Sequence, residues 1–347
     1  MYILLLVFSG FLELKTLIHR YPYFGKAIKL AHSPKSPDDL KSNAFKLAKK
    51  HKVYPLSIEP NKDRLFCIGE NGWSYIKTDN LGFRNSREIK KNEKFAYLIG
   101  DSFAHGACVS EENTFTGNLN KFLEKKEIFV KNLGGSGNNI IHYDMTLESF
   151  LPRNLTNKLR PEFVILLIME NDFNKQEQKN TLRAIKKINP EESYEIIDNH
   201  FALTSSAKLY FKNLSDLKQK KHVHGLSYVQ NFVQNIFTLK PITSSLISIK
   251  KGPIKSQRKD SSNVIRTIGN YSERLNSLEI PLIIGYIPSN GQLLEQRGSK
   301  DFEHKKFENY MERMSERKKL YFINFADYTK NSDYFIYGSG HYNKSGY

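Results

Sequence analysis

Cysteine is scarce in this chain: Cys67 and Cys108 are the only two among 347 residues. Their separation gives neither the ligand spacing of a zinc site nor the CxxC pattern of a redox centre. A single disulfide and two isolated, small apolar side chains are both compatible with the sequence. Nothing in the cysteine pattern requires a metal, and no organic cofactor is implied.

Long hydrophobic runs are also rare. The clearest is Met1–Leu12, which is shorter than the about 20 apolar residues of a spanning helix. It lacks the basic start and the small-residue cleavage site of a signal peptide. We expect residues 1–20 to form a membrane anchor that places the protein in the cell envelope. An apolar helix packed on a cytoplasmic protein is the alternative. The basic flank that follows would favour the cytoplasmic side of the membrane.

Acidic residues are outnumbered, 36 against 53 lysines and arginines, which gives a formal charge of +17. Such an excess favours an anionic partner. The basic residues are scattered, however, and they are not interleaved with aromatic residues as in nucleic-acid-binding motifs, so nucleic acid is disfavoured. An anionic membrane surface or an acidic polysaccharide fits at least as well. The densest basic patch, residues 250–259, lies in a polar segment and is expected to be an exposed loop.

The chain does contain enough apolar side chains for a core, with 39% hydrophobic and 12% aromatic residues. Residues 21–90 are polar, include five prolines and are interpreted as a stem that ends in the turn Asn80–Arg84. Residues 91–347 are expected to form the main domain. An insertion at about 189–261 interrupts its regular pattern.

From residue 95 onward, short apolar runs alternate with amphipathic ones, and continuous apolar runs are typical of strands buried on both faces. We expect strands at Phe95–Ile99, Ile128–Val130, Phe163–Met169, Pro281–Ile287 and Leu320–Phe325. We expect helices at Thr114–Glu124, Asn139–Phe150, Asn174–Lys187, Ser262–Leu278 and Lys300–Lys318. The alternation predicts a three-layer α/β/α sandwich with a flavodoxin-like parallel sheet of about five strands. In such sheets the ligand site lies at the carboxyl ends of the strands.

A serine stands at the end of the first predicted strand, in Gly100-Asp101-Ser102. This position exposes the attacking oxygen, and backbone amides at a helix start can stabilise an oxyanion. Asp-Ser is also an ordinary N-cap pair, so the motif alone decides little. The second strand is followed by the glycine-rich turn Asn132–Asn139, in which Gly137 could aim its N–H into the site. This turn is not a GxGxxG pattern, which disfavours a dinucleotide site; a plain tight turn is the alternative.

Asn171 follows the third strand, where a side-chain amide can donate to developing negative charge. Capping of the next helix by Asn171 and Asp172 is the alternative. His341, in the final loop, is the candidate general base. His105 lies three residues from Ser102 on the predicted helix start and is poorly placed to turn back onto the hydroxyl.

In order and spacing, these four blocks resemble the SGNH (GDSL-type) hydrolases over about residues 95–347. The resemblance implies a serine-dependent esterase with Ser102 as nucleophile and His341 as general base. It also implies an oxyanion hole formed by the N–H groups of Ser102 and Gly137 and by the Asn171 side chain.

The chain departs from the family pattern in three places. Family members usually carry an aspartate two or three residues before the histidine, where this chain has Ser339 and Gly338; Asp333 is eight residues upstream. The imidazole would then be held by a backbone carbonyl or by Ser339, in a Ser-His dyad. The usual glycine of the third block is Met169. The sequence also stops six residues past His341, where such domains normally continue into a terminal helix, so a trimmed domain and a fragment are both compatible.

The tether and the basic surface favour an O-acylated, and specifically acetylated, glycan or lipid of the cell envelope as the ester substrate. An O-acyltransferase that modifies a cell-surface polysaccharide would use the same residues and differ in how well water is excluded. A degenerate, non-catalytic glycan-binding domain of the same fold is the third hypothesis, favoured by the missing aspartate.

Overall fold

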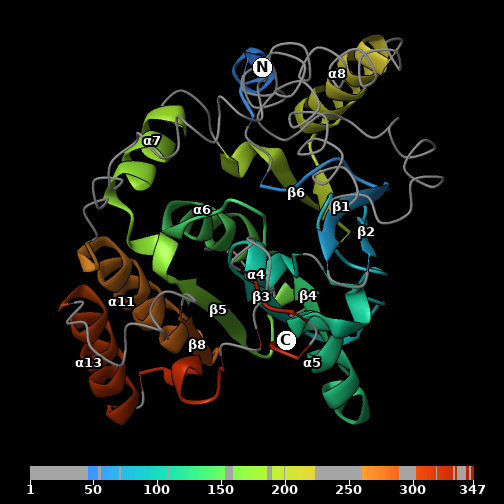
Figure 1. Ribbon diagram of the computed structural model, residues 1–347. Coiled ribbons are helices and arrows are strands. Elements are labelled where there is room, and N and C mark those ends of the chain that lie inside the picture. Colours follow the sequence, from blue (N-terminus) through green and yellow to red (C-terminus); the bar gives the residue numbers. More distant parts are fainter. Residues whose placement is uncertain are drawn as a thin grey trace, which may run out of the picture.

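The computed structural model describes residues 46–53, 56–69, 72–107, 109–152, 159–185, 190–198, 200–222, 260–288, 302–317, 319–330, 333, 341–343 and 345–347. Its centre is a five-stranded sheet with the strand order β4-β3-β5-β8-β9 (Figure 1). The strands are β3 (Lys94–Ile99), β4 (Ile128–Asn132), β5 (Val164–Met169), β8 (Leu282–Ile287) and β9 (Tyr321–Asn324). Every neighbouring pair is parallel. This is the flavodoxin-like order, and the five predicted strands are confirmed.

The central strands β3, β5 and β8 are almost entirely apolar because both faces of the sheet are covered there. In β3, Phe95, Tyr97 and Ile99 belong to the core on one face, and Ala96 and Leu98 belong to the core on the other. A strand with one solvent-exposed face would alternate apolar and polar residues instead. The continuous apolar run seen in the sequence therefore reflects a central position in the sheet.

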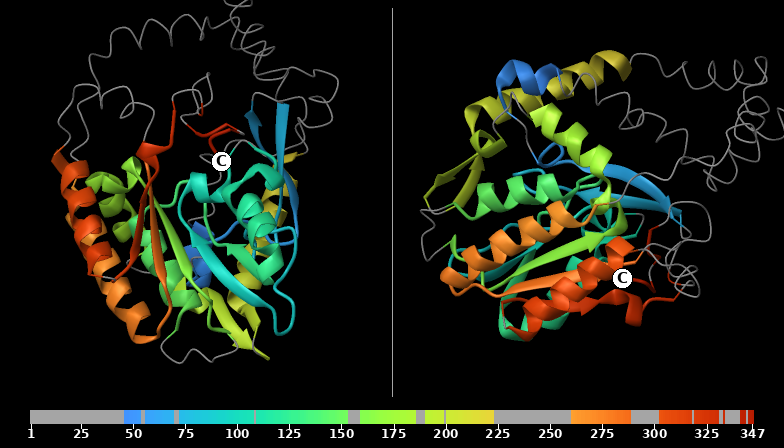
Figure 2. Two further views of the ribbon diagram at one scale, coloured as in Figure 1. Left: turned by 90° about the horizontal axis from the view of Figure 1, so that it is seen from below. Right: turned by 90° about the vertical axis from the view of Figure 1, so that its left-hand side faces the viewer.

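Helices lie on both faces of the sheet (Figure 2). Three of them contribute to the larger core on one face, namely α6 (Ile140–Phe150), α11 (Ser262–Ser277) and α13 (Phe302–Glu316). On the other face, α5 (Phe115–Leu123) packs on β3 and β4. A further helix, α7 (Lys175–Ile185), follows β5 in the chain. The α/β/α sandwich and the five predicted helices are confirmed.

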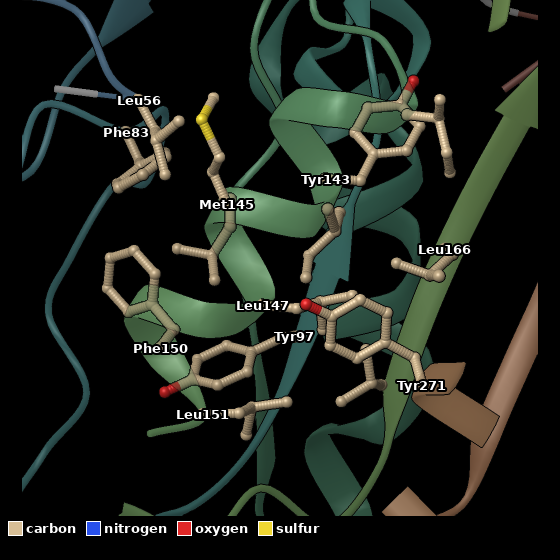
Figure 3. Packing of buried hydrophobic residues seen from close by; sticks show 14 of the residues in the cluster. Leu56, Phe83, Tyr97, Tyr143, Met145, Leu147, Phe150, Leu151, Leu166 and Tyr271 are labelled. Carbon is tan, nitrogen blue, oxygen red and sulfur yellow. The ribbon is translucent and has the colours of Figure 1, made fainter. Parts of the chain in front are cut away.

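The larger core joins α6 and α11 to the sheet (Figure 3). Tyr97 of β3 and Leu166 of β5 face Leu147 and Phe150 of α6, and Tyr271 of α11 lies beside them. Along α11, Val264, Ile268, Tyr271 and Leu275 are buried at three- or four-residue spacing, as in a helix with one buried stripe, whereas α6 is buried along most of its residues.

Part of the predicted stem belongs to this core. Leu56, Leu81 and Phe83 are buried among the core residues, and the Phe83 ring lies 5.5 Å from that of Phe150. Between Leu56 and Leu81 in the sequence, β1 (Asp63–Gly69) and β2 (Gly72–Lys77) form an antiparallel hairpin. Composition could not reveal this packing, because the buried residues are single apolar positions in a polar segment. The domain boundary at residue 90 stays a prediction.

The predicted insertion holds one helix in its described part, α8 (Ser205–His222), preceded by a hairpin that was not expected. The hairpin consists of β6 (Tyr194–Ile197) and β7 (His200–Leu203). Its first residue packs inward: the hydroxyl of Tyr194 accepts the backbone N–H of Leu56 at 3.0 Å, and its ring lies 4.9 Å from that of Phe150. The base of the insertion is therefore continuous with the core.

Within the described residues, no helix has the length and apolar character needed to cross a bilayer. The predicted anchor, residues 1–20, lies outside these residues, as do residues 21–45 of the stem and the basic patch at 250–259. Cys108, one of the two cysteines, also lies outside them.

Candidate active site

The predicted nucleophile stands at the carboxyl edge of the sheet. β3 ends at Ile99, and Ser102 begins the one-turn helix α4 (Ser102–His105). Asp101 caps this helix, because its Oδ1 accepts the backbone N–H of Phe103 at 2.9 Å. The N-cap reading of the Asp-Ser pair and the catalytic reading are therefore compatible. The cap fixes the turn on which the Ser102 hydroxyl is presented.

His341 is in hydrogen-bond contact with this hydroxyl. Its Nε2 lies 2.7 Å from Oγ of Ser102, although the two residues are 239 positions apart in the chain. The Phe103 ring lies 5.2 Å from the imidazole, and Tyr342 packs edge-on against Phe103 at 5.0 Å. The Tyr342 hydroxyl is 2.8 Å from that of Thr329, which anchors the histidine loop. The 2.7 Å separation between His341 Nε2 and Ser102 Oγ suits removal of the serine proton by an imidazole.

The other histidine near the nucleophile, His105, is in a different environment. It is buried at the end of α4, and burial together with the charge of Arg84 lowers its pKa to about 3. A histidine with that pKa stays neutral and is a weak base at physiological pH. The prediction of His341, rather than His105, as the base agrees with the burial and the low pKa of His105.

Asn171 lies directly beside the nucleophile turn. It belongs to the 3₁₀ turn η4 (Glu170–Phe173), and its Nδ2 donates to Oδ2 of Asp101 at 2.8 Å. An amide nitrogen carries two hydrogens, so a second one is left for a substrate oxyanion. The alternative, that Asn171 caps the next helix, is wrong: Oδ1 of Asn174 accepts the N–H groups of Gln176 and Glu177 at the start of α7.

The glycine-rich turn after β4 packs against the same helix. A Cβ on Gly134 would lie 2.6 Å from that of Ala104, so a larger residue there would displace α4. The N–H of Gly135 donates to the carbonyl of Gly100 at 3.1 Å. Gly137 has a φ of +79°, and a Cβ there would meet nothing within 4 Å, so its backbone faces open space. The turn thus reaches the site, with Gly137 accessible from outside.

The position of a third triad member is only partly described. Gly338 and Ser339 lie outside the described residues. The carboxylate of Asp333 accepts the N–H of Lys330 at 2.7 Å, and its carbonyl accepts that of Asn343 at 2.7 Å. Asp333 therefore ties down the loop that carries His341, through its backbone and its carboxylate.

The sequence predicts only a helix cap for Asp101, yet in the structure this residue also links two blocks of the site. Its carboxylate is buried, accepts from both Phe103 and Asn171, and lies near a second buried carboxylate, that of Asp172. Burial raises the pKa of Asp101 to about 6, against the hydrogen bonds that lower it. For Asp172, burial and the charge of Asp101 raise the pKa well above its usual range. Only the contact across 70 positions could have revealed this role.

Asp101 should make folding stability depend on pH in a defined direction. The pKa of Asp101 in the folded protein lies above the value of about 3.9 in an unfolded chain. Ionisation of Asp101 therefore lowers the free energy of unfolding above pH 6. This loss of stability disappears as the pH falls toward 4. Relative to Asp101→Asn, we expect the wild type to gain about 2 kcal/mol of unfolding free energy between pH 8 and pH 4. Urea titrations at each pH measure this difference.

Asp260 provides a control of opposite sign. Its carboxylate is paired with Lys175 at 2.9 Å, and hydrogen bonding lowers its pKa to about 2. The difference in free energy of unfolding between the wild type and Asp260→Asn should therefore shrink as the pH falls. A stability difference for Asp101→Asn that does not change with pH would contradict the burial argument.

Among the described residues, no group of three or more His, Cys, Asp or Glu side chains could hold a metal ion. The chemistry that this part of the chain offers is that of a serine hydroxyl, an imidazole and amide donors.

Comparison with known proteins gives matches among solved structures. No protein-family model and no curated protein sequence matches the chain. A member of the lipolytic G-D-S-L family from Veillonella parvula is 12% identical, with 73% of this chain and 91% of that chain covered and a TM-score of 0.38. Several of the matched structures are named as SGNH or GDSL proteins. This is the family that the four sequence blocks resemble.

Two further matches are similar in extent. A GDSL-like lipase from Bacteroides thetaiotaomicron is 10% identical, covering 75% of this chain and 85% of that chain with a TM-score of 0.35. AlinE4, an SGNH-hydrolase family esterase, is 11% identical, covering 67% of this chain and 77% of that chain with a TM-score of 0.34. At these values the matches decide nothing about the reaction, and the chemistry has to be argued from the chain's own residues.

Proposed function

We propose that this protein is a serine-dependent hydrolase of carboxylic esters. The observation that carries the proposal is the 2.7 Å contact between Ser102 Oγ and His341 Nε2 at the carboxyl edge of the sheet. The SGNH and GDSL structures that the chain resembles in fold include an esterase and a lipase, which agrees with this reaction class.

The proposed reaction begins when the Ser102 hydroxyl loses its proton to Nε2 of His341 and its oxygen attacks the ester carbonyl. The resulting oxyanion accepts hydrogen bonds from the N–H groups of Ser102 and Gly137 and from Nδ2 of Asn171. His341 then returns the proton to the leaving alcohol, which leaves an acyl group on Ser102. Water, activated by the same imidazole, releases the acid and restores the serine.

A fluorophosphonate probe tests the nucleophile directly, because it forms a covalent bond with an activated serine. We expect the wild type to be labelled and Ser102→Ala to be unlabelled. Ser205→Ala, at the exposed start of α8, is the matched control and should label like the wild type. Equal labelling of the wild type and Ser102→Ala would remove the proposal. Mass spectrometry of the labelled peptide provides the measurement.

The proposal extends to the substrate class. The apolar start of the chain and the formal charge of +17 favour an ester at an anionic surface, an O-acylated and specifically acetylated glycan or lipid of the cell envelope. Release of acetate from acetylated envelope polysaccharide by the wild type, and not by Ser102→Ala, is the expected result.

An O-acyltransferase acting on a cell-surface polysaccharide is the second candidate, because the acyl-enzyme could pass its acyl group to a sugar hydroxyl. Product analysis with and without a sugar acceptor separates the two: transfer gives an acylated sugar in place of free acid. Glycan binding without ester turnover, unchanged in Ser102→Ala, would instead favour a non-catalytic domain.

A further inference from the structure

The turn Asn80–Arg84 ends in an arginine whose side chain is buried beneath the nucleophile helix. Arg84 is 2% exposed. Its Nη1 donates to the carbonyls of His105, at 3.0 Å, and Gly106, and its Nη2 donates to that of Val109 at 2.8 Å. These carbonyls lie at the end of α4 and in the loop that follows it. The last carbonyls of a helix have no partner within the helix, and a cation suits that end.

The next residue reaches the same helix by a second route. Asn85 forms a pair of hydrogen bonds with the backbone of Asn132, accepting its N–H at 2.8 Å and donating to its carbonyl at 3.0 Å. The side chain of Asn132 in turn donates to the carbonyl of Ala104 at 2.6 Å and accepts the N–H of Gly134 at 2.8 Å. Asn85 is thus connected both to α4 and to the glycine-rich turn that carries Gly137.

The turn itself is held rigidly. The buried carboxylate of Asp79 accepts the N–H groups of Leu81 and Phe83, each at 2.9 Å. Lys131 places its Nζ 3.1 Å from the same carboxylate, and both side chains are almost fully buried. Arg84 and Asn85 therefore extend from a fixed base.

We propose that Arg84 and Asn85 are positioning residues that set the nucleophile helix and the glycine-rich turn relative to each other. The inference rests on the proposed ester hydrolysis at Ser102. Neither residue contacts Ser102 or His341 in the described contacts; they act through α4 and through Asn132. In this arrangement residues 79–85, which the sequence assigns to the stem, are part of the catalytic domain.

Only a guanidinium satisfies the three carbonyls together. A buried cation is costly unless hydrogen bonds compensate it, and the planar fork of Arg84 spans three neighbouring carbonyl acceptors. A lysine keeps the charge but carries its donors on one nitrogen without the planar fork, so it loses at least one of the three carbonyls. Small displacements matter, because a shift of about 1 Å in a catalytic group can cost about 10²-fold in rate.

The test compares Arg84→Lys with Arg87→Lys in the full chain. Arg87 lies three residues on and pairs with Glu93 at the surface at 2.6 Å, so it is a matched control. We expect Arg84→Lys to lower kcat for an aryl acetate at least about 10-fold with KM nearly unchanged, and Arg87→Lys to leave both unchanged. Rates are taken per fluorophosphonate-titrated serine, so that loss of folded protein does not count as loss of catalysis.

Hydrogen exchange gives a readout that is independent of turnover. Amides of residues 102–107 and 133–137 should exchange faster in Arg84→Lys, whereas those of α11 should not. Asn85→Ala should produce the same exchange pattern. It replaces Arg84→Lys in the test if Arg84→Lys folds poorly. Wild-type kcat per titrated serine in both variants, or a uniform rise in exchange, would overturn the positioning role. Absence of labelling in the wild type would instead reject the ester hydrolase and this inference with it.

Discussion

Replacing His341 by alanine is expected to lower kcat for an aryl ester by about 10⁴- to 10⁶-fold, with the protein still folded. His341 is the group placed to take the serine proton, since its Nε2 lies 2.7 Å from Ser102 Oγ. An alcohol is a weak nucleophile unless a base removes its proton during attack. Steady-state assays, with circular dichroism to verify folding, measure the effect.

The same substitution at His200 is the control. His200 lies on β7 of the exposed hairpin, where its ring contacts the carbonyl of Asp198 at 2.9 Å. His200→Ala should retain wild-type kcat. A His341→Ala variant with more than a tenth of the wild-type kcat would show that another group serves as base.

Replacing Asn171 by alanine is expected to lower kcat by about 10²- to 10³-fold, which is the usual cost of one oxyanion donor. Its Nδ2 already donates one hydrogen to Asp101 at 2.8 Å, so the amide is oriented before substrate arrives. Because the oxyanion exists only in the transition state, KM should change little. Steady-state kinetics on an aryl acetate give both constants.

Asn174 supplies the matched control for this prediction. Its side chain caps α7 by accepting the N–H groups of Gln176 and Glu177. Asn174→Ala should cost about 1 kcal/mol of stability and leave kcat near the wild-type value. Should Asn171→Ala raise KM alone, the residue would be a ground-state binding group instead of an oxyanion donor.

The sheet was predictable because the information for it is local. Each of the five strands is a short apolar run, such as Val164–Met169, and each ends where the sequence changes to polar or glycine-rich residues. The β6–β7 hairpin was missed. Its alternation in Tyr194–Leu203 is brief, and its strands of four residues each resemble an irregular segment.

Two parts of the candidate site could not be predicted from the sequence. Asp101 stands in the nucleophile motif, yet its contact with Asn171 depends on how two strand ends meet. Arg84 was noted only as the end of a turn, because nothing nearby in sequence indicates that its side chain is buried beneath α4. In both cases the partner lies more than twenty positions away.

The sequence by itself determined the succession of strands and helices along the chain. It also determined that Ser102, Gly137 and Asn171 follow strand ends. These follow from hydrophobic periodicity and turn chemistry, which act over a few residues. The tertiary structure alone decided that His341 reaches Ser102 and that the segment around Arg84 supports the nucleophile. Such contacts depend on the path of the whole chain, because parallel strands bring together residues that are far apart in sequence.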